Sequence, residues 1–281
     1  MHGAGRRRSG ALKDVCAPVD TEMGEHMASF YDRADIYDLF EDENSYRAYG
    51  KHWETVLLGK KVKTMLDVSI GSGRVTLPVV DLGVELSGSD LSESMLKNCE
   101  KKARERKQKV TLKCSDFRDL SCWENQTFDM VASTGNSLAY VPNGDVLKTL
   151  EQMDAHVSEG GYLYFDTRNW DRILAEQPRF YLYNPLFDGD NRINVIQVWD
   201  YHADNSMTFN ILYTFEKDNR IFQKEKFEEH YFPVSRKLLL EKLESLGYEN
   251  IEFYGFPAQY SAGDMDKVEW YTVVAKKKRT E

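Results

Sequence analysis

The stretch Leu66-Asp67-Val68-Ser69-Ile70-Gly71-Ser72-Gly73, followed by Gly88-Ser89-Asp90, is the most informative part of this sequence. An apolar run ends in two closely spaced glycines, and a second apolar run ends in an acid. This order predicts a strand, a glycine turn that opens a helix, and a second strand. Glycines in such a turn let the backbone approach a ligand, and the acid can accept both hydroxyls of a ribose. We therefore expect an adenosine-containing cofactor at this turn.

The spacing of this turn differs from the dinucleotide fingerprint. That fingerprint has a third glycine, which would stand where this chain has Thr76. The third glycine serves close packing of the helix beside a pyrophosphate. A nucleotide without a pyrophosphate, such as S-adenosylmethionine (SAM), therefore fits the turn better than NAD does.

Composition limits the class of protein. With 281 residues and 41% hydrophobic content, the chain can bury one sizeable core with a smaller appended layer. The 46 acidic residues outnumber the 37 basic ones, for a formal net charge of -9. Because phosphate neutralisation needs clustered Lys and Arg, no nucleic-acid partner is expected.

Targeting and redox signals favour a cytoplasmic protein. No apolar run reaches the roughly 18 residues that a membrane span needs, so no membrane partner is expected. The N-terminus lacks the apolar core of a signal peptide. The cysteines (Cys16, Cys99, Cys114 and Cys122) show no metal-ligand spacing and no disulfide framework. We therefore expect no metal and a reducing compartment.

The first part of the chain predicts alternating helices and strands. Residues 1–27 have no regular period, and we interpret them as a disordered or added leader ahead of a start near Met27. Residues 30–59 have a helical pattern. Strands are expected at 63–69, 84–89, 109–114, 128–133 and 161–167, with helices at 73–81, 92–106 and 144–157. This alternation predicts an α/β fold, a Rossmann-like parallel sheet with helices on both faces.

The pattern changes after residue 190. Three β segments at 192–201, 207–216 and 220–231 are separated by Asp, Asn and Ser, which favour turns, so we expect an inserted antiparallel meander. A helix at 234–246 and strands at 249–254 and 268–275 follow. The expected parts are a cofactor-binding domain with a helical lid (28–189), a substrate-side insertion (190–232) and the rest of the first domain (233–281).

Ligands of parallel sheets bind at the carboxyl ends of the strands, which makes polar residues there candidates. Gly71 and Gly73 lie between strand and helix, where the cofactor should bind. Asp67 either caps the turn by accepting backbone N–H bonds or shapes the cofactor loop. Asp90 either binds the ribose or caps the next helix, a role that is also open to Ser92.

The third and fourth strands end in further candidates. Asp116 and Phe117 could bind the amino group and ring of adenine, or form an ordinary turn with a core phenylalanine. Asn136 follows the fourth strand and is polar without being charged. Such a group suits a site that holds a sulfonium cation without a strong nucleophile beside it.

Arg168 ends the fifth strand. A guanidinium at that position offers a planar fork for a carboxylate. A salt bridge with Asp166 or Asp171 is the alternative, and the residues alone leave both open.

Taken together, these stretches resemble class I SAM-dependent methyltransferases and, within them, the glycine N-methyltransferase and glycine/sarcosine N-methyltransferase family. The resemblance runs from about Tyr31 to the C-terminus and is carried by residues 66–73, 89–96, 135–140 and 166–174. The first two stretches are shared by many methyltransferases, whereas the last two are more specific. The resemblance implies a seven-stranded sheet, SAM as methyl donor, S-adenosylhomocysteine (SAH) as product, and glycine or sarcosine as acceptor, as in betaine biosynthesis.

The resemblance also implies site residues. Arg168 would bind the carboxylate of the amino-acid substrate, with Asn136 in the same pocket, and Arg47 would bind the methionine carboxylate of SAM. The expected catalytic residues are Tyr31, Asn136, Arg168 and Tyr213, and the substrate set adds Tyr140 and Tyr231. The expected cofactor-binding residues are Tyr31, Tyr37, Arg47, Asp67, Gly71, Gly73, Asp90, Leu91, Met95, Asp116, Phe117, Thr134 and Asn136.

Departures from the family pattern leave the acceptor open. Tyr140 stands where the family commonly has His, Thr134 where it has Leu, and Phe117 where it has Trp. A SAM-dependent enzyme with another N- or O-acceptor is the nearest alternative, and a non-catalytic SAM-binding regulatory protein is another. An NAD-dependent oxidoreductase is disfavoured by the missing glycine. The partner is a small amine or amino acid, and the protein is a monomer or homo-oligomer.

Overall fold

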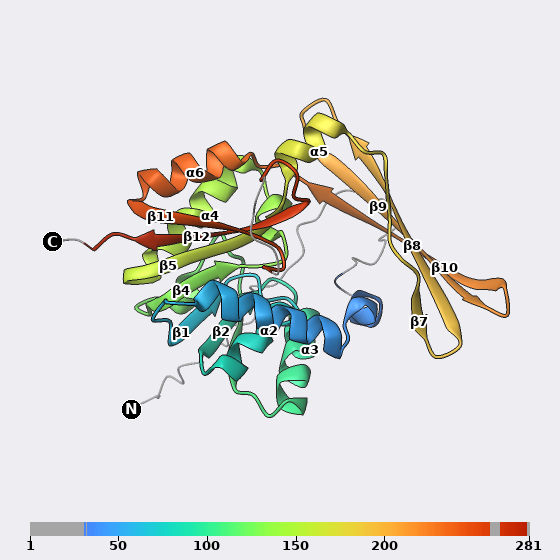
Figure 1. Cartoon of the computed structure of the whole chain (residues 1–281), viewed down its shortest axis with the longest axis horizontal. Helices are drawn as coiled ribbons and strands as arrows, with labels where there is room; N and C mark the ends of the chain where they lie inside the picture. The colour runs from blue at the N-terminus through green and yellow to red at the C-terminus, as the bar shows by residue number, and fades with distance from the viewer. Residues whose placement is uncertain (1–30, 32, 259–264, 280–281) are drawn as a thin grey trace, which may run out of the picture.

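A computed structural model describes residues 31, 33–258 and 265–279. The leader expected over residues 1–27 lies outside these residues. The described chain forms a large mixed sheet with helices on both faces and a second, antiparallel sheet that projects from it (Figure 1). We call the second sheet the arm.

The large sheet has seven strands in the order β11-β12-β5-β4-β1-β2-β3. Strands β1 to β5 are parallel, whereas β12 runs antiparallel to β5 and β11 antiparallel to β12. This arrangement confirms the predicted Rossmann-like sheet. The strands are β1 (Thr64–Asp67), β2 (Glu85–Asp90), β3 (Val110–Cys114), β4 (Phe128–Ser133), β5 (Val157–Arg168), β11 (Tyr248–Gly255) and β12 (Trp270–Lys277).

Helices cover both faces of this sheet. On one face, Trp53 of α2 (Glu43–Leu57) and Leu96 of α3 (Glu93–Glu105) pack with Met65 of β1. On the other face, Val146 of α4 (Asn143–Ala155) and Leu239 of α6 (Arg236–Ser245) share a core with Leu66 (Figure 1). Successive strand residues point to opposite faces, so both core layers share the same strands. The shorter helices are α1 (Ala34–Tyr37), η2 (Asp38–Phe40), η3 (Leu77–Leu82), η4 (Ser121–Trp123), η5 (Ser137–Tyr140) and α5 (Trp170–Glu176).

The helical pattern over residues 30–59 is broken in two. A reciprocal capping box starts α2 at Asp42: Asp42 Oδ1 accepts from Ser45 N at 2.7 Å, and Ser45 Oγ accepts from Asp42 N at 2.9 Å. A cap satisfies donors that a helix start leaves open, so it fixes where the helix begins. The short helices α1 and η2 therefore form a separate segment, which we call the lid segment (residues 31 and 33–42).

The helix predicted over residues 73–81 is wrong. The glycine turn leads into one α-type hydrogen bond, from Leu77 N to Gly73 O at 2.9 Å, and then into the 3₁₀ helix η3. Pro78 has no N–H to continue the α pattern, and Gly83 ends the element with φ = 83°.

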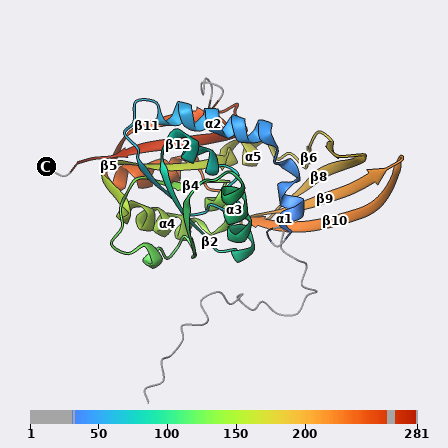
Figure 2. The ribbon, with the colours of Figure 1, turned by 90° about the horizontal axis from the view of Figure 1, so that it is seen from below.

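The arm confirms the predicted antiparallel meander. It contains β8 (Asn191–Tyr201), β9 (Met207–Lys217) and β10 (Arg220–Tyr231), joined in sequence order. Two short strands before residue 190, β6 (Phe180–Leu182) and β7 (Leu186–Asp188), also pair with β8. Figure 2 shows α1 beside β9 and β10, and Phe40 packs on Tyr213 with ring centroids 6.5 Å apart. Among the described helices, none is long and apolar enough to cross a membrane.

Candidate active site

A cavity of about 890 Å³ lies where the lid segment, the strand ends and the arm meet. The lid segment and α2 contribute aromatic side chains, the glycine turn and β5 contribute arginines, and the arm contributes tyrosines. Parallel-sheet proteins bind ligands at this edge, and the volume falls in the range of small-molecule sites. Of the predicted site residues, the following line the cavity: Tyr31, Tyr37, Tyr140, Arg168, Tyr213 and Tyr231.

The guanidinium of Arg168 is surrounded by aromatic rings. Its Cζ lies 5.0 Å from the ring centroid of Trp270. The rings of Tyr181, Trp199 and Phe209 lie at 5.7, 5.5 and 5.5 Å. Within the described part of the chain, no carboxylate is within ion-pair distance of this guanidinium.

Neither acid that the sequence offered as a partner of Arg168 pairs with it. Asp171 Oδ2 accepts from Arg236 N at 3.0 Å. Asp166 Oδ1 accepts from Trp270 Nε1 at 2.9 Å and from Gly135 N at 3.0 Å. Burial raises the pKa of Asp166 to about 7. The salt-bridge alternative is therefore absent from the described structure, and Arg168 is available to a ligand.

Asn136 is buried behind the cavity wall. Its backbone is left-handed, with φ = 63°. Its Oδ1 accepts from Thr167 Oγ1 and Arg168 N, both at 3.0 Å, and from Trp170 Nε1 at 3.1 Å. Three donors converge on this one oxygen, so the side chain ties the end of β4 to the end of β5. In the described structure it is not among the cavity-lining residues.

Three tyrosine hydroxyls form a line in the cavity wall. Tyr31 donates to the Tyr140 hydroxyl, which shares a hydrogen bond of 2.6 Å with the Tyr231 hydroxyl. Burial raises the pKa of Tyr31 and Tyr140 well above the usual value near 10. These two hydroxyls therefore stay neutral near pH 7.

The glycine turn is tied to β2 through Asp90. Gly71, whose φ is 53°, donates from its N–H to Asp90 Oδ2 at 2.8 Å, and Ser92 N donates to Oδ1 at 2.9 Å. Ser92 is the N-cap of α3 and accepts from Met95 N at 3.3 Å. The helix-cap role therefore falls to Ser92. Binding of a ribose by Asp90 stays a prediction.

Asp67 holds the turn together from inside. Its Oδ2 accepts from Thr76 Oγ1 at 2.6 Å and Thr134 Oγ1 at 2.7 Å, and its Oδ1 accepts from Ser69 N at 3.1 Å. Burial raises the pKa of this carboxyl to about 6. Thr76 thus uses the place of the missing third glycine for a hydrogen bond inside the turn.

Most predicted cofactor residues do not line this cavity as described: Arg47, Asp67, Gly71, Gly73, Asp90, Leu91, Met95, Asp116, Phe117, Thr134 and Asn136. Arg47 differs most from expectation. It lies exposed on α2, where its Nη2 donates to Asn44 Oδ1 at 2.7 Å. Asp116 pairs with Arg118 at 2.5 Å. The placement of Arg47 does not support a role at a cofactor carboxylate.

Arg74 is a cavity residue that sequence reasoning missed. It directly follows Gly73, and a cation in that position was the available signal. Its Nη2 donates to Phe40 O at 3.3 Å, and its Cζ lies 5.8 Å from the ring centroid of Tyr49. Its Nε is buried and has no hydrogen-bond partner in the described chain.

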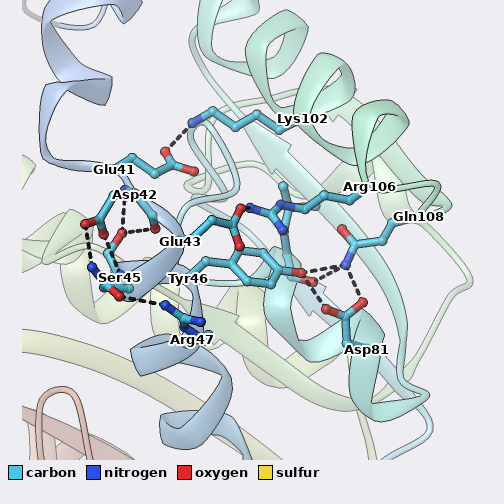
Figure 3. Close-up of polar contacts among 12 residues, drawn as sticks. Glu41, Asp42, Glu43, Ser45, Tyr46, Arg47, Asp81, Lys102, Arg106 and Gln108 are labelled. Atoms are coloured by element: carbon cyan, nitrogen blue, oxygen red, sulfur yellow. Dashed lines mark hydrogen bonds and ion pairs between the residues drawn. The ribbon is translucent and has the colours of Figure 1, made fainter. Parts of the chain in front are cut away.

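An ionic cluster holds the lid segment against α3. Lys102 Nζ pairs with Glu41, lies 2.8 Å from Asp38 Oδ1 and 3.1 Å from Ser72 Oγ, and keeps only 14% of its side chain exposed. Asn98 Nδ2 donates to Asp38 Oδ2 at 2.5 Å. Figure 3 shows Lys102 reaching Glu41 and, farther along, Arg106 meeting Glu43. Lys102 therefore joins the lid segment, the glycine turn and α3.

Comparisons with known proteins agree with this geometry. Residues 65–161 match the methyltransferase domain family. The chain is 25% identical over 277 residues to a glycine/sarcosine N-methyltransferase of Parasynechococcus marenigrum, covering 97% of this chain and 91% of that protein. It is 25% identical over 260 residues to the glycine/sarcosine N-methyltransferase of Aphanothece halophytica, covering 92% of each. A SAM-dependent methyltransferase structure from Clostridium acetobutylicum shares the fold, with a TM-score of 0.69, 19% identity and coverage of 87% of this chain and 97% of that one.

Proposed function

We propose that this chain, a class I SAM-dependent methyltransferase resembling the glycine/sarcosine N-methyltransferases, methylates the amine nitrogen of a small amino acid. Glycine and sarcosine are the first candidates. One observation carries the proposal: Arg168 lines the cavity without a carboxylate partner in the described chain. The relatives at 25% identity support the choice of glycine and sarcosine.

The residues at the glycine turn fit SAM. Gly71 and Gly73 have positive φ angles, which suit a turn whose backbone approaches a ligand, and we expect the Asp90 carboxylate beside this turn to accept ribose hydroxyls. Arg74 offers a cation with a buried, unpartnered Nε at the same turn. When bound, SAM supplies a methyl group that its sulfonium already activates.

The acceptor end needs orientation more than acid–base chemistry. Arg168 would bind the substrate carboxylate through a bidentate fork. The neutral hydroxyls of Tyr31, Tyr140 and Tyr231 would orient the amine. Holding two reacting groups about 3–3.5 Å apart and in line can contribute several kcal/mol. We assign no general base, so the amine loses its proton to solvent and the rate should rise with pH toward the pKa of the amine.

The compartment that we propose is the cytoplasm. Cys99 and Cys122 are free thiols in the described structure. Free thiols persist in a reducing cytoplasm. This proposal is independent of the acceptor.

An acceptor screen tests the proposed function. SAM with a deuterated methyl group is supplied with glycine or sarcosine, and in parallel with methylamine or dimethylamine, which lack the carboxylate but keep the amine. Mass spectrometry of the products should show kcat/KM for the amino acids at least about 100-fold above the carboxylate-free amines, because a bidentate ion pair is lost. Equal kcat/KM for both groups, or transfer only to hydroxyl acceptors, would overturn the proposal. Calorimetry shows whether the protein binds SAM or NADH, which distinguishes a methyltransferase from an enzyme that transfers hydride.

A further inference from the structure

We propose that Arg74 binds the carboxylate of the methionine part of SAM. The proposal concerns the cofactor end of the cavity. It rests on SAM dependence and not on which amine is methylated. It assigns to the glycine turn a role that the sequence resemblance placed on Arg47.

The surroundings of Arg74 point to an anionic ligand. The side chain lines the cavity and is enclosed by Tyr37, Phe40 and Tyr49. Its Nη2 donates to Phe40 O over a long 3.3 Å, and the guanidinium also hydrogen-bonds the Tyr49 hydroxyl. A buried guanidinium N–H without an acceptor costs free energy, and an incoming carboxylate would recover it.

The two acids that interact with Arg74 already have cationic partners. Asp38 and Glu41 of the lid segment interact electrostatically with Arg74. Both are held by Lys102, and Asp38 also accepts from Asn98. In the described chain, no carboxylate lies within ion-pair distance of the Arg74 guanidinium. The guanidinium, which lines the cavity, is therefore without a carboxylate partner among the described residues.

The charge of this cluster matches the amino-acid end of SAM. Arg74 and Lys102 balance Asp38 and Glu41, so the cluster is neutral. The methionine end of SAM is a zwitterion, with one carboxylate and one ammonium. Its carboxylate would bind Arg74, while its ammonium would enter the field of the two lid acids, and no net charge would be added.

The cavity has two arginines, Arg74 and Arg168, and could therefore bind one carboxylate of the cofactor and one of the acceptor. Arg74 stands at the glycine turn, close in sequence to Gly71 and Gly73, whereas Arg168 stands at the end of β5, among rings of the arm and Trp270. A ligand whose ribose Asp90 binds would direct its amino-acid end along the turn to Arg74, which directly follows Gly73. Arg168 is then left for the acceptor.

Calorimetry with two cofactor analogues tests the proposal. SAH is compared with S-adenosyl-3-thiopropylamine, which is SAH without its carboxylate. The unaltered protein should bind SAH about 20- to 100-fold more tightly, whereas Arg74→Met should reduce this ratio to less than about 3-fold. Arg74→Lys should give an intermediate ratio, because an ammonium keeps the charge without the planar fork.

Arg168→Met is the matched control, since it removes the other arginine of the same cavity. It should keep the ratio of the unaltered protein. The ratio is internal to each variant, so it does not depend on the fraction of folded protein. Equal affinities for both ligands in the unaltered protein, or an unchanged ratio in Arg74→Met and Arg74→Lys, would overturn the proposal. Loss of the ratio in Arg168→Met would instead contradict the acceptor role of Arg168.

Discussion

The indole of Trp270 lies against the guanidinium of Arg168 on one side and hydrogen-bonds Asp166 on the other. The register of β12 on β5 pairs Trp270 with Arg168, its ring centroid is 5.0 Å from Arg168 Cζ, and its Nε1 donates to Asp166 Oδ1 at 2.9 Å. A single side chain thus satisfies the buried acid and leaves the cation without an acid partner.

At pH 8, Trp270→Phe should lower the free energy of unfolding by about 1–3 kcal/mol more than Trp199→Phe does. The reason is that Trp270→Phe removes a hydrogen bond to the carboxylate of Asp166. Trp199 Nε1 donates instead to the neutral Gln197 Oε1 at 2.9 Å. Urea denaturation of both variants measures the difference. Equal losses would show that the charge on Asp166 contributes nothing through this bond.

Arg168→Lys should raise KM for the amino-acid acceptor about 10- to 100-fold, because lysine cannot reproduce a bidentate fork. The SAH affinity should stay within about 2-fold. Steady-state kinetics and calorimetry separate the two effects. Arg192→Lys serves as the control, because Arg192 forms an ion pair with Glu216 within the arm. An unchanged KM in Arg168→Lys would remove the basis of the carboxylate assignment.

Lys102→Met should loosen the lid segment and weaken SAH binding about 5- to 20-fold. The reason is that Asp38 and Glu41 lose their cation while staying largely buried. Lys101 directly precedes Lys102 on α3 and forms only an exposed ion pair with Glu105. Lys101→Met should therefore change the affinity for SAH less than about 2-fold. Calorimetry provides the comparison, and similar affinities for the two variants would contradict a role for the cluster in holding the lid.

His52 should make stability depend on pH. Its Nδ1 accepts from Ala258 N at 2.9 Å, so Nε2 carries the proton toward the Tyr164 hydroxyl at 2.9 Å. Burial lowers its pKa to about 3, below the usual 6.5, so between these values the unfolded chain binds a proton that the folded chain does not. The contribution of His52 is complete above about pH 6.5 and is lost toward pH 3, at about 1.4 kcal/mol per pH unit.

His52→Gln removes this titration. Urea unfolding between pH 5 and 7.5 should therefore show a shallower fall in stability at low pH for the variant than for the unaltered protein. Comparing the two proteins cancels the opposite effect of Asp67 and Asp166, whose pKa values burial raises. Parallel curves would mean that folding does not shift the pKa of His52.

The two turn glycines should differ in how they tolerate alanine. A Cβ at Gly73 would lie 2.7 Å from Cys99 Sγ and from Leu77 Cγ, and φ is 77° there, whereas a Cβ at Gly71 would have Met95 Cε at 3.7 Å. Gly71→Ala should cost about 1–2 kcal/mol for its left-handed backbone. Gly73→Ala should cost about 1–3 kcal/mol more, because overpacking adds to this strain. Thermal or urea unfolding measures both, and equal losses would contradict the packing argument.

Local pattern was enough to predict most of the fold. The strands from Thr64 to Arg168 are apolar runs with polar ends, and the arm has alternating residues with Asp and Asn at its turns, so both follow from short-range chemistry. The helix predicted over 73–81 failed because Pro78 interrupts a pattern that otherwise looks helical. The short strands β6 and β7 carry too few residues to show a period.

The site was harder to predict than the fold. Tyr31, Tyr140 and Tyr231 were expected in one pocket and do line one cavity. Arg47 was expected at the cofactor carboxylate but lies exposed on α2, whereas Arg74, which the sequence analysis did not single out, lines the cavity. The sequence could not decide the partners of Arg168. Asp166 accepts a hydrogen bond from Trp270 instead, and Trp270 lies 102 positions after Arg168 in the chain.

The line of tyrosine hydroxyls also has a consequence for how the protein acquires its binding site. Its two hydrogen bonds join residues 109 and 91 positions apart. Contacts between residues so distant close long loops, which costs more chain entropy than forming local turns and helices. We therefore expect the cavity wall to be completed after the local turns and helices. Cofactor binding during refolding should follow the recovery of helical signal, so that ligand binding reports the last assembly step of the chain.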